Sequence, residues 1–181
     1  SLGAHEIDRW LERRFDPPSR AFVEYWFHRD TQKELAALMM GIEEMDDGAL
    51  RYFFGLVFSA IIITKSGGVS LARDLAHTRP HKVKDKTPAC ALDEFRKRLQ
   101  RNISNFRFIP EATFQICAAN AQHLPLGDNT IDLIVTSPPY ASNAIDYMRA
   151  HKFSLVWFGY SIDELSSLRK TYIGQDSFKG F

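Results

Sequence analysis

The sequence contains few cysteines and no long hydrophobic run, and these shortages exclude several classes of protein. Only two cysteines occur among the 181 residues, Cys90 and Cys117, and neither belongs to a CxxC pair or a histidine cluster. A disulfide scaffold and a metal site are therefore not expected, and a reducing compartment suits the chain. The longest apolar run, 53–63, is too short to span a bilayer. Because the N-terminus also shows no signal-peptide pattern, we expect a cytoplasmic protein without membrane contact.

The chain also lacks an excess of charge of either sign. Lys and Arg number 23 against 22 Asp and Glu, which gives a formal net charge of +1. A nucleic-acid partner would therefore have to be held by a local basic patch, since the whole molecule is not polycationic. Apolar residues make up 45% of the chain and charged ones 25%, which is typical of a folded protein. At this length we expect a single domain, 1–181.

The first part of the chain, 1–110, is predicted to be mainly helical. A Pro-Pro pair at 17–18 should end the first helix, and Thr31 with Glu34 forms a capping box for the next. A strand is an alternative for 56–63, but no turn signal precedes this run, so a helix is favoured. Apolar side chains recur at helical spacing in four stretches, at 7–15, 35–42, 50–61 and 92–103.

A basic segment, 66–88, interrupts this helical portion. Glycines and prolines break its regularity, and its cations outnumber its acids, so a long basic loop is predicted. Cations in a loop can bind nucleic-acid phosphates, while a solvated loop is the alternative. The candidate nucleic-acid-binding residues are Arg79, Lys82, Lys84 and Lys86.

Strand signals appear only in the second portion, 111–181. Residues 113–118 form a short β-prone run, and 132–136 form an apolar run of the kind found in strands buried on both faces of a parallel sheet. The sequence therefore predicts an α/β fold. The remaining expected features are a turn at 124–129, a helix at 144–158 ended by Gly159, and a capping box of Ser161 with Glu164.

The most informative motif is Ser137-Pro138-Pro139-Tyr140, which follows the predicted strand directly. Two consecutive prolines stiffen the loop and remove two backbone donors. The loop would lie at the carboxyl end of a strand, the edge where open α/β sheets place their ligands. There the Ser137 hydroxyl and the Pro138 carbonyl can accept hydrogens from an amino group, and Tyr140 can stack on a ring. This arrangement suits a planar substrate that carries an NH2 group.

The strand followed by SPPY resembles the catalytic motif of amino-methylating S-adenosylmethionine-dependent DNA methyltransferases. The resemblance extends over 116–140, through Ala119-Asn120-Ala121, Leu124-Pro125 and Asp132-Leu133-Ile134. It implies a Rossmann-like sheet, of which this chain would carry only a few strands beside its large helical portion. It also implies that a target base leaves the stack and that residues 137–140 orient its exocyclic amine. Serine in first place favours cytosine N4 over adenine N6.

The resemblance further implies an S-adenosylmethionine site, with contacts at Asn120 and Thr136. Asn120 stands where the family usually has an acidic residue, and this chain contains no FxGxG-type glycine-rich segment. We therefore expect the chain to be a piece of a larger enzyme, whose remaining half completes the cofactor site, and to bind the cofactor poorly alone. Two alternatives stay open: an N-methyltransferase acting on RNA or on a protein glutamine, and a non-catalytic nucleic-acid-binding helical module.

Overall fold

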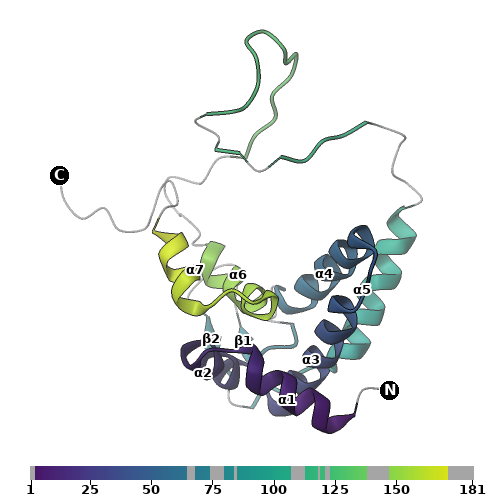
Figure 1. Cartoon of the computed structure of the whole chain (residues 1–181), viewed down its shortest axis with the longest axis vertical. Coiled ribbons are helices and arrows are strands. Elements are labelled where there is room, and N and C mark those ends of the chain that lie inside the picture. Colours follow the sequence, from purple (N-terminus) through teal and green to yellow (C-terminus); the bar gives the residue numbers. More distant parts are fainter. Residues whose placement is uncertain are drawn as a thin grey trace, which may run out of the picture.

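A computed structural model describes most of the chain, and its described part is mainly helical. The described residues are 3–64, 68–73, 80–83, 85–106, 113–117, 119–120, 123–137 and 147–170. Within them lie seven α-helices, one 3₁₀ helix and one two-stranded sheet, an α/β arrangement dominated by helices (Figure 1). The elements are α1 (Ala4–Arg14), α2 (Pro17–Trp26), α3 (Arg29–Glu43), α4 (Gly48–Ile62), β1 (Ala72–Arg73), β2 (His81–Lys82), α5 (Ala91–Phe106), α6 (Tyr147–Leu155), η1 (Val156–Phe158) and α7 (Ile162–Arg169).

The two strands form a short antiparallel ladder inside the segment expected to be a loop. Ala72 pairs with Lys82, and Arg73 pairs with His81. The ladder is tied to the helices because the Leu71 amide donates to the Trp26 carbonyl, at 2.7 Å. The described part of the basic segment is therefore attached to α2. None of the helices that the structure describes is long and apolar enough to cross a membrane.

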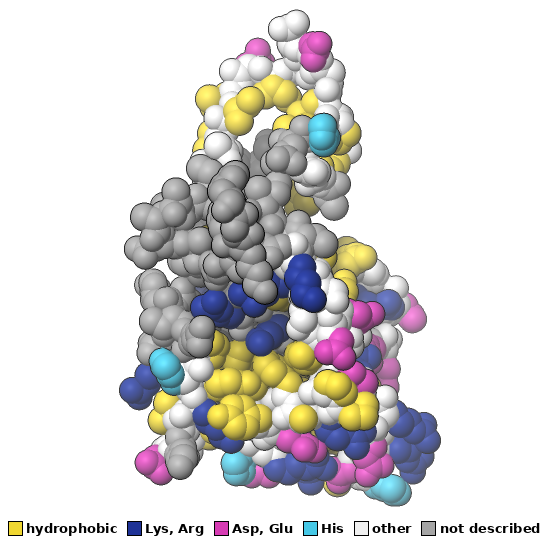
Figure 2. Space-filling view, turned by 90° about the vertical axis from the view of Figure 1, so that its left-hand side faces the viewer, with side chains coloured by type: hydrophobic (Ala, Val, Ile, Leu, Met, Phe, Trp, Pro, Cys, Tyr) yellow, Lys and Arg dark blue, Asp and Glu magenta, His cyan; other side chains and the backbone are white. Residues whose placement is uncertain are grey.

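The strands predicted at 113–118 and 132–136 are not present in the described residues of either stretch. The prediction of a strand buried on both faces is wrong there, because Val135 is 88% exposed and Leu133 and Ile134 are exposed almost as fully. Figure 2 shows hydrophobic side chains of this region open to solvent in the upper lobe. An apolar β-branched run becomes a buried strand only between neighbouring strands. The described part of the chain supplies none beside it.

The helix boundaries in the first portion follow local signals. The Pro-Pro pair at 17–18 occupies the first turn of α2, where proline needs no backbone donor. The Asp16 side chain caps this helix by accepting from the Ser19 amide, at 3.3 Å. The pair therefore separates α1 from α2, as predicted. The stretch 56–63 is helical up to Ile62, so the helix interpretation is confirmed.

The capping box predicted at Thr31 and Glu34 is wrong. Helix α3 begins at Arg29, so Thr31 lies inside it and is only 4% exposed. The Glu34 carboxylate instead accepts from the Ala91 amide at 2.5 Å and from Cys90 Sγ at 3.3 Å. Unpaired amide groups at a helix start favour a negative charge. Glu34 therefore caps α5, a helix far away in the sequence.

The C-terminal helices follow their sequence signals closely. The helix predicted over 144–158 is α6 followed by η1, and its first three residues lie outside the described part. Gly159 ends it with φ +96°, the left-handed region that glycine enters without strain. The Ser161 and Glu164 capping box is confirmed. The Glu164 amide donates to Ser161 Oγ at 3.1 Å, and the Ser161 amide donates to Glu164 Oε2 at 2.8 Å.

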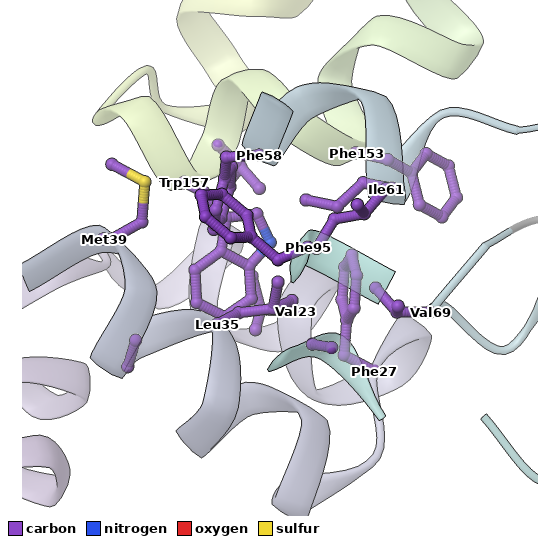
Figure 3. Close-up of a cluster of buried hydrophobic side chains, with 14 of the residues drawn as sticks. Val23, Phe27, Leu35, Met39, Phe58, Ile61, Val69, Phe95, Phe153 and Trp157 are labelled. Atoms are coloured by element: carbon purple, nitrogen blue, oxygen red, sulfur yellow. The ribbon is translucent and has the colours of Figure 1, made fainter. Parts of the chain in front are cut away.

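A single hydrophobic core joins the two portions of the chain. Trp157, in η1, is fully buried and lies in the same cluster as Phe27 and Phe58 (Figure 3). Its ring makes edge-to-face contacts with Phe15 and Phe27, at ring-centroid distances of 5.3 and 5.5 Å. Arg14 adds a polar link, since its Nη2 donates to the Trp157 carbonyl at 2.7 Å and its Nη1 pairs with Glu43 at 2.9 Å. Helices before and after the SPPY motif are thus packed against each other.

Candidate functional site

The SPPY motif belongs to a segment that begins and ends on the helical core. Helix α5 ends at Phe106 and α6 begins at Tyr147, and the described parts between them form a long loop that stands away from the helices (Figure 1). Thr136 and Ser137 are exposed and lie outside any helix or strand. Pro138, Pro139 and Tyr140 lie outside the described residues. The structure therefore places the start of the motif and leaves its assigned chemistry as a prediction.

The turn predicted before the motif is confirmed. The Thr130 hydroxyl donates to the Gly127 carbonyl at 2.8 Å. Asn129 has φ +58°, a left-handed conformation that asparagine tolerates better than most residues. This turn reverses the chain and directs residues 131–137 back toward the helices.

Asn120, the candidate cofactor contact, lies on the other arm of the loop. It forms an isolated antiparallel bridge with His123, whose amide donates to the Asn120 carbonyl at 2.9 Å. Its side chain is exposed, as are those of Thr136 and Ser137. These exposed side chains do not enclose a cofactor, and no carboxylate stands at position 120 to bind a ribose. The described residues alone therefore do not form an S-adenosylmethionine site, and the contacts assigned to Asn120 and Thr136 stay predictions.

The structure separates the cations of the basic segment into different environments. Lys82 is exposed on β2, and its ammonium lies 4.3 Å from the centre of the Tyr25 ring. Lys86 is half-buried instead. The two remaining candidates, Arg79 and Lys84, lie outside the described residues. Of the two candidates that the structure describes, Lys82 is therefore the one whose charged group is exposed to solvent.

Lys86 holds the basic segment together. Its Nζ donates to the carbonyls of Gly68, Ser70 and Ala72, at 3.2, 2.7 and 3.1 Å. Burial, and to a smaller extent the charge of Arg73, lowers the pKa of Lys86 below its usual value. We refer to this arrangement as the Lys86 clamp. It gives Lys86 a structural role that its position in a cation-rich sequence did not indicate.

Sequence reasoning missed a cluster of aromatic and basic side chains beside β2. Lys152 of α6 lies over the Phe22 ring, with Nζ 5.3 Å from its centre, much as Lys82 lies over Tyr25. Phe22 and Tyr25 are one turn apart on α2, a spacing that the sequence shows. The lysines come from distant elements, so no local pattern could have identified the cluster.

Comparisons with protein-family models, with curated proteins and with solved structures find no match for this chain.

Proposed function

We propose that this chain is the catalytic-motif portion of a DNA amino-methyltransferase, which methylates cytosine N4 or adenine N6. The observation that carries the proposal is the apolar run 131–136 leading directly into Ser137-Pro138-Pro139-Tyr140. A stiff loop with two oxygen acceptors and an aromatic ring suits an exocyclic amine on a planar base. S-adenosylmethionine would supply the methyl group from a site completed by residues outside this chain.

Exposed apolar side chains in the loop support the idea that other residues complete the sheet. Eight large hydrophobic side chains between 113 and 137 are exposed. A soluble protein rarely leaves so many apolar groups uncovered in one segment unless another surface covers them. Neighbouring strands of a larger sheet would bury these side chains and convert 132–136 into the strand that the sequence favours. The exposed side chains are Phe114, Ile116, Leu124, Leu126, Ile131, Leu133, Ile134 and Val135.

The roles of this chain's residues concern the target base. The Ser137 hydroxyl and the Pro138 carbonyl accept hydrogens from the amine, which directs the nitrogen lone pair away from the loop. Tyr140 stacks on the base and holds its plane. In such a reaction positioning supplies much of the rate, because no nucleophilic side chain is required. The same acceptors would serve an RNA base or a glutamine amide, so the assay includes both.

The test measures transfer of a tritiated methyl group from S-adenosylmethionine to DNA by the longer protein that contains this chain. Tyr140→Ala should lower the rate about five- to 100-fold, the equivalent of one lost stacking contact. Ser137→Ala should also lower it, and both changes should affect methylation more than duplex binding. Tyr52→Ala is the matched control, since Tyr52 is exposed on α4 and should leave the rate unchanged.

Two results would contradict the proposal. One is methylation at the parental rate by both Ser137→Ala and Tyr140→Ala. The other is methyl transfer to RNA or to a glutamine-containing peptide with none to DNA. Nucleoside analysis of the labelled product distinguishes N4-methylcytosine from N6-methyladenine.

A further inference from the structure

Two lysines lie over two aromatic rings on one side of the helical core. Tyr25 is 53% exposed with the Lys82 ammonium 4.3 Å from its ring centre, and Lys152 lies 5.3 Å from the centre of Phe22. We define Phe22, Tyr25, Lys82 and Lys152 as the aromatic–basic face. This face places an ammonium group next to each of two aromatic rings.

Three of the elements at this face carry no acidic side chain. Helix α6, β1 and β2 contain no aspartate or glutamate, whereas α2 contributes one of each sign, Arg20 and Glu24. Because the whole chain carries a net charge of only +1, this is a local concentration of positive charge. Figure 2 shows Lys and Arg side chains beside hydrophobic ones over the helical part of this side. The basic side chains of the three elements are Arg73, His81, Lys82, Arg149, His151 and Lys152.

The rings of the face are held in place from below. Phe22 and Trp26 each lie 5.0 Å from the fully buried Phe153, measured between ring centroids. Tyr25 contacts Trp26 edge-on, at 4.9 Å. A ligand that stacks on such rings does not have to order them first, which lowers the entropy cost of binding.

We propose that the aromatic–basic face binds a nucleic-acid strand with unpaired bases. The ammonium groups would move from the ring faces to contact phosphates, and the rings would then contact sugars and unstacked bases. In a duplex the bases already stack on one another, so a duplex would contact only the lysines of this face. Helix α6 begins seven residues after Tyr140 in the sequence, so Lys152 of this face belongs to a helix that closely follows the motif.

This inference deepens the proposed function, because the bound strand would be the one from which the target base is taken. Its test needs no methyl transfer, so the two proposals can fail separately. Fluorescence anisotropy measures binding of a labelled oligothymidine and of a duplex of equal length, over a series of KCl concentrations. The parent chain should bind the single strand more tightly than the duplex.

Three variants test the lysines and the Tyr25 ring separately. Lys82→Gln combined with Lys152→Gln should reduce the slope of log affinity against log salt by about 1.4, because two phosphate contacts are lost. Tyr25→Leu keeps apolar bulk without a ring and should weaken single-strand binding about fivefold or more. Tyr25→Phe keeps the ring and should bind like the parent. Thermal melting of each variant is compared with that of the parent, so that weaker binding caused by a less stable fold is recognised.

The matched control removes two charges from another basic region. Lys97 and Arg101 of α5 line a cavity of about 480 Å³ between α4 and α5. Lys97→Gln combined with Arg101→Gln should leave the salt slope unchanged. An equal fall in slope for this control, or parental binding by Tyr25→Leu, overturns the proposal. So does tighter binding of the duplex, or displacement of the oligonucleotide by phosphatidylglycerol vesicles, which would make this a lipid-binding face.

Discussion

Replacing Lys86 by methionine should destabilise the fold by about 2.5–3.5 kcal/mol. Methionine keeps the length of the side chain but leaves the carbonyls of Gly68, Ser70 and Ala72 without the ammonium donor. Three such bonds at about 1.5 kcal/mol each are partly offset by about 1–2 kcal/mol of desolvation that a neutral side chain avoids. The net loss is large for a lysine that the sequence presents either as a phosphate contact or as part of a solvated loop.

The measurement is urea unfolding followed by circular dichroism, with stability compared at equal m-value. Lys97→Met is the control. Lys97 is exposed and forms an ion pair with Glu94 on its own helix, so no measurable change is expected. The reasoning fails if Lys86→Met and Lys97→Met unfold at the same urea concentration. It also fails if Lys86→Met lowers the salt dependence of DNA binding while leaving stability untouched.

The same residue predicts a pH dependence. The lowered pKa of Lys86 in the folded state means that the unfolded chain holds this proton at pH values where the folded chain has begun to lose it. The unfolded state then binds more protons, so stability rises with pH across the window just below 10.5. The difference in stability between the parent and Lys86→Met should therefore grow as the pH approaches 10.5, and a constant difference would contradict it.

Two further changes test the packing. Glu34→Ala should lower stability by about 1–2 kcal/mol, because the start of α5 loses its cap. Glu34→Gln should lower stability less, since an oxygen acceptor remains. Hydrogen exchange at the Ala91 amide checks whether the loss is at that helix start. Trp157→Ala should cost about 3–5 kcal/mol by leaving a cavity among Phe15, Phe27 and Phe58, and loss of near-ultraviolet circular dichroism should accompany it. Unchanged stability in either case would contradict the contact assigned to that side chain.

Local signals in the sequence predicted much of the helical structure. The Pro-Pro pair at 17–18, Gly159 and the Ser161–Glu164 box act within one turn of themselves, so their neighbours in the sequence are enough to interpret them. Glu34 was misinterpreted because its partner is the start of α5, a helix more than 50 residues away. A capping pattern identifies a suitable side chain but not the helix end that it reaches.

Strands depend on partners even more than caps do. The run 132–136 has the composition of a buried strand, yet in the described part of the chain no strand lies beside it and its side chains are exposed. The SPPY motif could be found from sequence because its chemistry is contiguous. The aromatic–basic face could not, because Tyr25, Lys82 and Lys152 come from three elements that meet only after folding.

The position of Trp157 has a consequence for the order in which the protein can fold during synthesis. The ring of Trp157 contacts Phe15 and Phe27, which emerge from the ribosome first. Trp157 follows more than 120 residues later. Until then the helices of the first portion have an unfilled core and expose apolar surface, a state that favours aggregation and chaperone binding. Contacts of such long range also slow folding. Translation speed through the SPPY segment would therefore set how long the nascent helices wait for the residue that closes their core.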